Sequence, residues 1–83
     1  MSREIDVERV QTGVRIEKRI LKVLKSLAET MDLSLGDLIE GIVLHAFENK
    51  KPFTAKTLQH IDQLREIYGL DLVAEDSHKL RDR

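Results

Sequence analysis

The first clear pattern along the chain is an alternation of two kinds of position between Val10 and Ile16. Val10, Thr12, Val14 and Ile16 fall on one side of an extended chain, and Gln11, Gly13 and Arg15 fall on the other. This period of two predicts a β-strand that ends where a helical period begins at Glu17. No second stretch has a comparable pattern, and a lone strand leaves its backbone donors and acceptors unpaired. We therefore expect the strand to pair with a second copy of this protein.

Beyond the strand, the spacing of apolar residues predicts three amphipathic helices. The helices are expected from Glu17 to Met31, from about Leu35 to Phe47, and from Ala55 to about Tyr68. Ser34 and Thr54 are residue types that cap helix starts, and Gly69 is suited to end the third helix. The apolar side of the third helix would let it pack on the second.

Composition narrows the class of protein. A chain of 83 residues forms one domain at most. A core of this size stabilises the fold only marginally unless a cross-link, a bound metal or an oligomer interface adds to it. The chain has no cysteine, so neither a disulfide nor a thiolate metal site can supply this added stability. Self-association is the remaining source. No apolar run approaches the roughly 20 residues that span a bilayer, and the start of the chain lacks the apolar core of a signal peptide. We expect a soluble cytoplasmic protein with no membrane partner.

Charge is distributed unevenly along a chain that is close to neutral. Residues 9–25 contain six bases and one acid, a net charge of +5, whereas residues 32–83 contain seven bases and ten acids, a net charge of −3. One interpretation is that the lysines and arginines only solvate the outer face of the first helix. The other is that strand and helix form an electrostatic footprint for a phosphate backbone. In the second case the phosphate contacts would include Arg9, Lys18, Arg19 and Lys22.

No pattern in the chain indicates catalysis. The only imidazoles, His45, His60 and His78, have no partner at metal-ligand spacing. The serines lack a nucleophile signature, and the chain has no glycine-rich phosphate loop. We therefore expect no catalytic residue, no metal site and no cofactor.

The order of strand, helix and helix, with basic residues around the strand, resembles the ribbon-helix-helix family of dimeric DNA-binding proteins, the Arc- and MetJ-like repressors. The resemblance covers residues 9–47. It rests on Thr12-Gly13-Val14-Arg15-Ile16, on Ser34-Leu35 opening a helix that ends at Phe47, and on the apolar spacing of Ile20, Leu21, Leu24, Leu27 and Ala28.

This resemblance implies a mainly α-helical, intertwined homodimer with an intermolecular two-stranded antiparallel sheet, plus a third C-terminal helix. The paired strands would lie in the major groove of double-stranded DNA, where Gln11, Gly13 and Arg15 hold the base-reading positions. Gly13 has no side chain, so specificity would be low or would come from DNA shape and neighbouring dimers. The start of the second helix would bind phosphate at Ser34, Leu35 and Gly36. The dimer core would consist of Val14, Ile16, Leu24, Leu38, Ile39, Ile42 and Val43.

The predicted organisation is a flexible arm at residues 1–8, a dimerisation and DNA-binding core at residues 9–47, and an extension at residues 48–83. That extension would hold one helix, at about residues 55–68, and a loose tail. The function expected is a transcriptional regulator, such as a repressor, that is nucleoid-associated when bound to DNA. The alternative is a dimeric interaction module, such as an antitoxin, whose residues 52–83 bind a partner protein. The two functions can coexist in one chain.

Overall fold

The computed structural model describes residues 3–83 and contains three α-helices of thirteen residues each. They are α1 (Lys18–Thr30), α2 (Leu35–Phe47) and α3 (Ala55–Ile67), followed by a short 3₁₀ helix, η1 (Ala74–Asp76). The three predicted helices are confirmed to within one residue at each end. No helix within residues 3–83 has the length and apolar character needed to cross a membrane.

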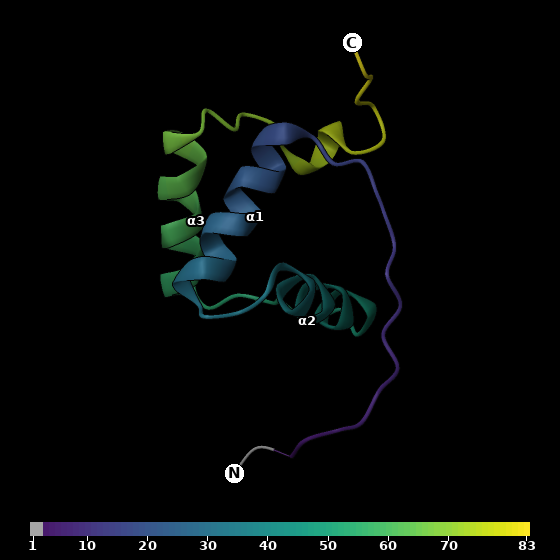
Figure 1. Ribbon diagram of the computed structural model, residues 1–83. Helices are drawn as coiled ribbons and strands as arrows, with labels where there is room; N and C mark the ends of the chain where they lie inside the picture. Colours follow the sequence, from purple (N-terminus) through teal and green to yellow (C-terminus); the bar gives the residue numbers. More distant parts are fainter. Residues whose placement is uncertain (1–2) are drawn as a thin grey trace.

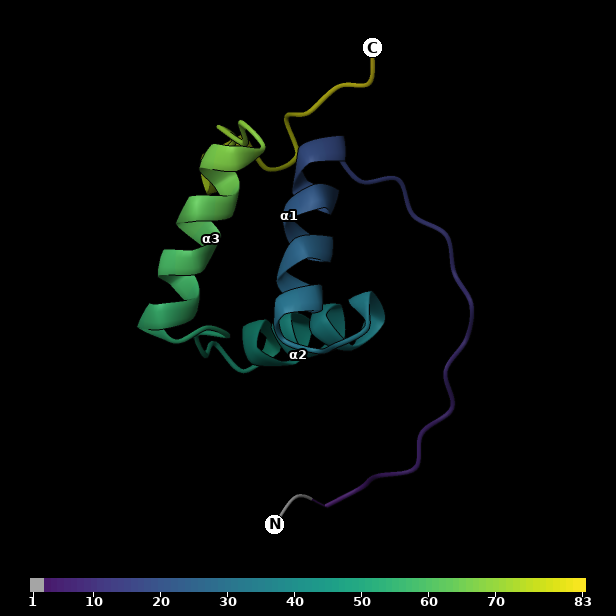
Figure 2. The ribbon, with the colours of Figure 1, turned by 60° about the vertical axis from the view of Figure 1, so that its left-hand side comes forward.

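The first helix is the centre of the fold, because α1 packs against both α2 and α3. Figures 1 and 2 show α3 beside α1, and α2 running across the C-terminal end of α1. The two outer helices do not pack on each other, so the expected packing of the third helix on the second is wrong. A single small core explains this arrangement, since Leu38 of α2 and Leu64 of α3 join one cluster with Val23, Leu27 and Ala28 of α1.

All three helices end in the same way. The residue two positions after the end of each helix has a left-handed backbone, with φ of 58° at Asp32, 55° at Asn49 and 64° at Gly69. The next amide donates back to a carbonyl of the last turn, as from Leu33 N–H to Ala28 O at 2.9 Å. The amides of Lys50 and Leu70 do the same, each at 2.8 Å. This Schellman pattern satisfies carbonyls that a helix end otherwise leaves unpaired, and glycine or a short polar residue favours it.

The predicted N-terminal β-strand is wrong. Residues 3–83 contain three α-helices and no strand or sheet, so the ribbon-helix-helix architecture with its intertwined homodimer and intermolecular sheet is contradicted. The segment with alternating residues has no secondary structure, and no backbone hydrogen bond links residues 3–16 to another segment. A strand exists only when its backbone groups pair with a neighbour, which alternation of side chains alone does not supply.

Candidate nucleic-acid interface

The segment that carries the predicted base-reading residues is an arm, residues 3–16, that lies outside the helical body. Figures 1 and 2 show the arm leaving the start of α1 and running along the outside of the packed helices. Every residue from Arg3 to Arg15 is exposed, and Ile16 is half-buried. Gln11, Gly13 and Arg15 therefore all lie on the arm in contact with solvent. A groove of about 960 Å³ separates the arm from α1 and α2, with Val10, Leu21 and Ile39 among its lining residues.

One bidentate ion pair ties the arm to α2. Arg9 donates from Nε to Glu40 Oε2 at 2.9 Å and from Nη2 to Glu40 Oε1 at 2.8 Å. Hydrogen bonding to Glu40 raises the pKa of Arg9, and hydrogen bonding to Arg9 lowers the pKa of Glu40 against the opposing effect of desolvation. Parallel contacts of this kind fix geometry as well as charge. Arg9, predicted as a phosphate contact, is thus held by a carboxylate of the same chain.

The other two arginines of the basic segment also meet carboxylates. Arg15 Nη2 lies 2.7 Å from Asp82 Oδ2 near the end of the chain, with both side chains largely exposed. Arg19 reaches into the segment after α3, donating from Nη1 to Gly69 O at 2.9 Å and to Asp71 Oδ1 at 3.0 Å. These arginines connect the beginning of the chain to its last fifteen residues, which sequence spacing alone does not indicate.

Glu17 joins the arm to α1 and acts as the cap of that helix. Its carboxylate accepts from the backbone N–H groups of Arg19 at 2.9 Å and Ile20 at 3.0 Å, and from Arg19 Nε at 3.0 Å. Desolvation raises the pKa of Glu17, but the hydrogen bond from Ile20 and the contacts with Arg19 together bring this pKa below its ordinary value. The same contact raises the pKa of Arg19. Like Arg9, Arg19 was predicted to contact phosphate and instead contacts a carboxylate of the same chain. Its contact with Glu17 helps to stabilise the start of α1.

The lysines of α1 form an exposed cationic surface within the basic segment. Lys18, Lys22 and Lys25 are exposed and are spaced so that they share one face of the helix, a surface here called the lysine ridge. Lys22 Nζ lies 5.7 Å from the centroid of the Tyr68 ring, within the range of a cation–π contact. None of the three lysines belongs to an ion pair described for residues 3–83. Because an α-helix rises about 1.5 Å per residue, the ridge extends for about 10 Å from Lys18 to Lys25.

The start of α2, the other predicted phosphate site, is built differently from the lysine ridge. Ser34 caps the helix by accepting the Asp37 N–H at 3.1 Å, which confirms its predicted capping role. Leu35 is half-buried, and Gly36 is exposed. Asp37 lies in the first turn, and Glu40, whose charge is offset by Arg9, lies one turn further on. The carboxylate of Asp37 opposes a polyanion at the position where the amides alone would attract one.

The residues predicted to form a dimer core divide into three groups. Leu38 belongs to the core of the single chain, and Leu24 and Ile42 pack against that core. Ile16 and Ile39 are half-buried, whereas Val14 is 72% exposed and Val43 37% exposed. The prediction did not include Leu44 and Phe47, which expose 64% and 80% on the same helix as Val43. The sequence shows that both residues are apolar. It does not show whether apolar residues outside the buried face of a helix contact solvent or another chain.

Comparisons with known proteins identify no relative of this chain. No protein-family model matches the chain, and neither the curated proteins nor the solved structures searched contain a match to it. Within residues 3–83, no group of three or more histidine, aspartate or glutamate side chains is placed to hold a metal ion.

Proposed function

We propose that this protein is a homodimeric DNA-binding regulator that contacts double-stranded DNA with its arm and its lysine ridge. The observation that carries the proposal is the continuity of exposed cations from the arm into the helix, from Arg15 through Lys18 and Lys22 to Lys25. Lysine side chains that neutralise phosphates release condensed counterions, which supplies affinity for any duplex. The dimer proposed here needs no paired strands.

Phosphate contacts are assigned to the lysine ridge rather than to the start of α2. The ridge has exposed ammonium groups, whereas the start of α2 carries Asp37 and Glu40. Base contacts are assigned to Gln11 and Arg15 on the arm, because glutamine can pair with adenine and arginine with guanine. Gly13 offers no side chain, so the expected specificity is low.

The amount of exposed surface supports a second copy as the partner. The chain exposes 7816 Å². A compact monomer of 9.6 kDa exposes about 5,100 Å² on the usual scaling of area with mass, so the excess is roughly 2,700 Å². Interfaces of obligate homodimers bury about 2,000–5,000 Å² in total, which this excess can supply. Val10 and Val14 on the arm and Leu44 and Phe47 on α2 provide the apolar side chains for such an interface, since each is at least 64% exposed.

The DNA proposal is tested by fluorescence anisotropy of a labelled duplex at several salt concentrations. Replacing Lys18, Lys22 and Lys25 by glutamine is expected to reduce the salt slope of log affinity by roughly 2 to 3. A matched control replaces Lys50, Lys51 and Lys79 by glutamine, which removes the same charge elsewhere and is expected to leave most of the slope. Equal losses in both triple variants, or no binding by the natural sequence, would reject the lysine ridge as the interface.

Arg15→Ala separates base reading from phosphate binding. If Arg15 pairs with a base, the variant loses affinity for the preferred duplex and keeps its affinity for a scrambled one, at a cost of about 1 to 3 kcal/mol. A uniform loss on both duplexes would make Arg15 a phosphate contact instead.

The dimer is tested by sedimentation equilibrium over a range of protein concentrations. Leu44→Lys and Phe47→Lys together are expected to shift the natural dimer to a folded monomer, because both side chains are exposed in the single chain. Lys substitution at Val73, which is 49% exposed on the last segment, serves as the control. A natural protein that stays monomeric at high concentration would contradict the dimer.

A second candidate function is a module that binds another protein through residues 52–83. The observation that favours it is the exposure of four large apolar side chains in this extension, namely Leu58, Ile67, Val73 and Leu80. Co-expression with the product of an adjacent gene, followed by size-exclusion chromatography, tests this candidate. A stable complex that Leu58→Lys and Ile67→Lys disrupt would support it, and separate elution would reject it for that partner.

A further inference from the structure

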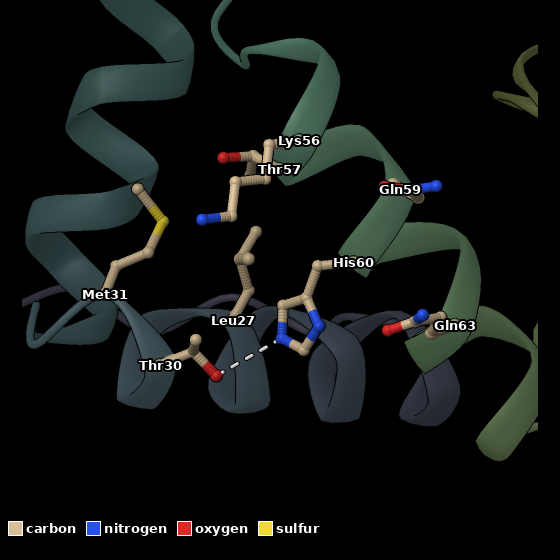
Figure 3. Close-up of a pocket in the computed structure, with 8 residues that line it drawn as sticks. All are labelled: Leu27, Thr30, Met31, Lys56, Thr57, Gln59, His60 and Gln63. Atoms are coloured by element: carbon tan, nitrogen blue, oxygen red, sulfur yellow. Dashed lines mark hydrogen bonds between the residues drawn. The ribbon is translucent and has the colours of Figure 1, made fainter.

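A groove of about 390 Å³ lies between α1 and α3, separate from the arm and from the lysine ridge. Its size falls within the range of small-molecule sites. Figure 3 shows its residues on two facing segments, with Leu27 and Thr30 on α1 and Met31 directly after it, and Lys56 and His60 reaching across from α3. Neither the DNA proposal nor the dimer proposal uses this groove.

On the side of α1, the groove is lined by Leu27, Thr30 and Met31, of which Leu27 and Met31 are apolar. Leu27 is 2% exposed and belongs to the core, so it is fixed in place by the packing of the helices. Met31 is 40% exposed, and its unbranched side chain adapts to irregular shapes. A ligand that covered Met31 would remove apolar surface from water, whereas Leu27 is already almost fully buried.

The polar part of the groove is cationic or neutral and contains no carboxylate among its lining residues. Lys56 contributes an ammonium group that belongs to no ion pair described for residues 3–83. Beside it, His60 Nε2 lies 3.2 Å from Thr30 Oγ1, and Gln59 and Gln63 contribute amide groups to the lining. An anion placed near Lys56 therefore meets an opposite charge and hydrogen-bond donors, with no like charge in the lining.

From this combination we infer that the groove binds a small amphipathic carboxylate, whose apolar chain covers Met31 beside the buried Leu27 and whose carboxylate meets Lys56. An inorganic anion would gain nothing from the apolar floor, and an ammonium ligand would be repelled by Lys56. The inference is independent of DNA binding, because the groove shares no residue with the arm or the lysine ridge.

The experiment titrates the full chain with octanoate, 1-octanol and octylammonium, three probes with the same apolar chain and different head groups. Two-dimensional ¹H–¹⁵N NMR locates the binding site and gives the affinity of each probe. Octanoate is expected to bind most tightly, with shifts at Leu27, Met31 and His60, and octylammonium is expected to bind most weakly.

Two variants and a control identify the source of the preference. Lys56→Gln is expected to weaken octanoate about three- to fivefold and to leave 1-octanol unchanged, since one exposed cation is lost. Gln59→Glu places a carboxylate in the lining and is expected to weaken octanoate alone. Lys51→Gln removes a lysine outside the groove and should change neither probe. Circular dichroism verifies that each variant keeps its helices.

The outcomes decide the inference in both directions. A carboxylate preference that Lys56→Gln abolishes supports it, whether or not the protein binds DNA. Equal affinity for octanoate and 1-octanol would overturn the charge recognition. Shifts confined to Val10, Leu21 and Ile39 would place binding in the groove beside the arm, and no shift at all would overturn the site.

Discussion

Glu17 decides how the arm ends and how α1 begins. Aspartate, serine and threonine are the usual caps, but here the longer carboxylate reaches the Arg19 and Ile20 amides and also holds the Arg19 side chain. Arg19 in turn contacts Gly69 O and Asp71. One ionised carboxylate therefore supports both a helix start and the attachment of the segment that follows α3.

Acidification is expected to test this role of Glu17. Because its pKa in the folded protein lies below the ordinary value of 4.5, its contribution to stability is complete above about pH 4.5 and is lost as pH falls through the lowered pKa. Glu17→Gln should be less stable than the natural protein at neutral pH, with the difference shrinking below pH 4.5. Thermal unfolding followed by circular dichroism from pH 7 to pH 2.5 measures it. A difference that stays constant with pH would show that the charge of Glu17 is not involved.

Gly69 shows what a left-handed backbone requires after a helix. Its φ is 64°, and a Cβ added at this position would meet no atom within 4 Å. Any cost of a side chain here therefore comes from the backbone and not from a collision. Gly69→Ala is expected to destabilise the protein by about 1 to 2 kcal/mol, as measured by urea unfolding. Gly13→Ala on the arm is the control, since Gly13 also has open space and no positive φ, and a similar loss there would contradict the explanation.

At the scale of elements, the sequence predicted the helices well because their signals are local. Ser34 and Thr54 cap α2 and α3 as expected, and the apolar spacing placed the helix bounds to within one residue. The strand prediction was wrong because the alternation between Val10 and Ile16 concerns side chains only. A strand also needs a backbone partner, which residues 3–83 do not supply.

The candidate interface was predictable only in part, for a similar reason. Composition located the basic segment, and helical spacing located the lysine ridge. The carboxylates that meet Arg9 and Arg15 lie 31 and 67 positions further along the chain, at Glu40 and Asp82, where no local pattern indicates them. The groove between α1 and α3 depends equally on long-range packing, since its two walls are distant in the sequence.

The pairing of Arg15 with Asp82 leads to a prediction about competition for the arm. Asp82 forms an ion pair with the guanidinium group of Arg15, which the proposed function assigns to a DNA contact. Asp82→Asn removes this competing partner and is therefore expected to raise affinity for a duplex. The gain should not exceed about fivefold, because exposed ion pairs are weak. Anisotropy titration measures it, with Glu75→Gln as a control that removes the same charge from the same segment. Equal gains in the two variants would reflect net charge and not this pair.

At the scale of the whole molecule, α1 packs against both of the other α-helices described for residues 3–83, and those two do not pack on each other. Val23, Leu27 and Ala28 of α1 are buried, whereas α2 and α3 each bury a single residue in the shared core. The outer helices are thus held through α1 and not through each other. Loss of contact between α1 and one outer helix leaves the other contact in place.

This arrangement sets an order in which amide hydrogens should exchange with deuterium. Detachment of α2 or of α3 opens that helix alone, but the amides of α1 open fully only when both neighbours have separated. Native-state exchange followed by NMR is therefore expected to show the slowest rates in the middle of α1, near Val23 and Leu27, and faster rates in α2 and α3. If α2 or α3 exchanged as slowly as α1, the three helices would open as one unit, and the central position of α1 would have no energetic consequence.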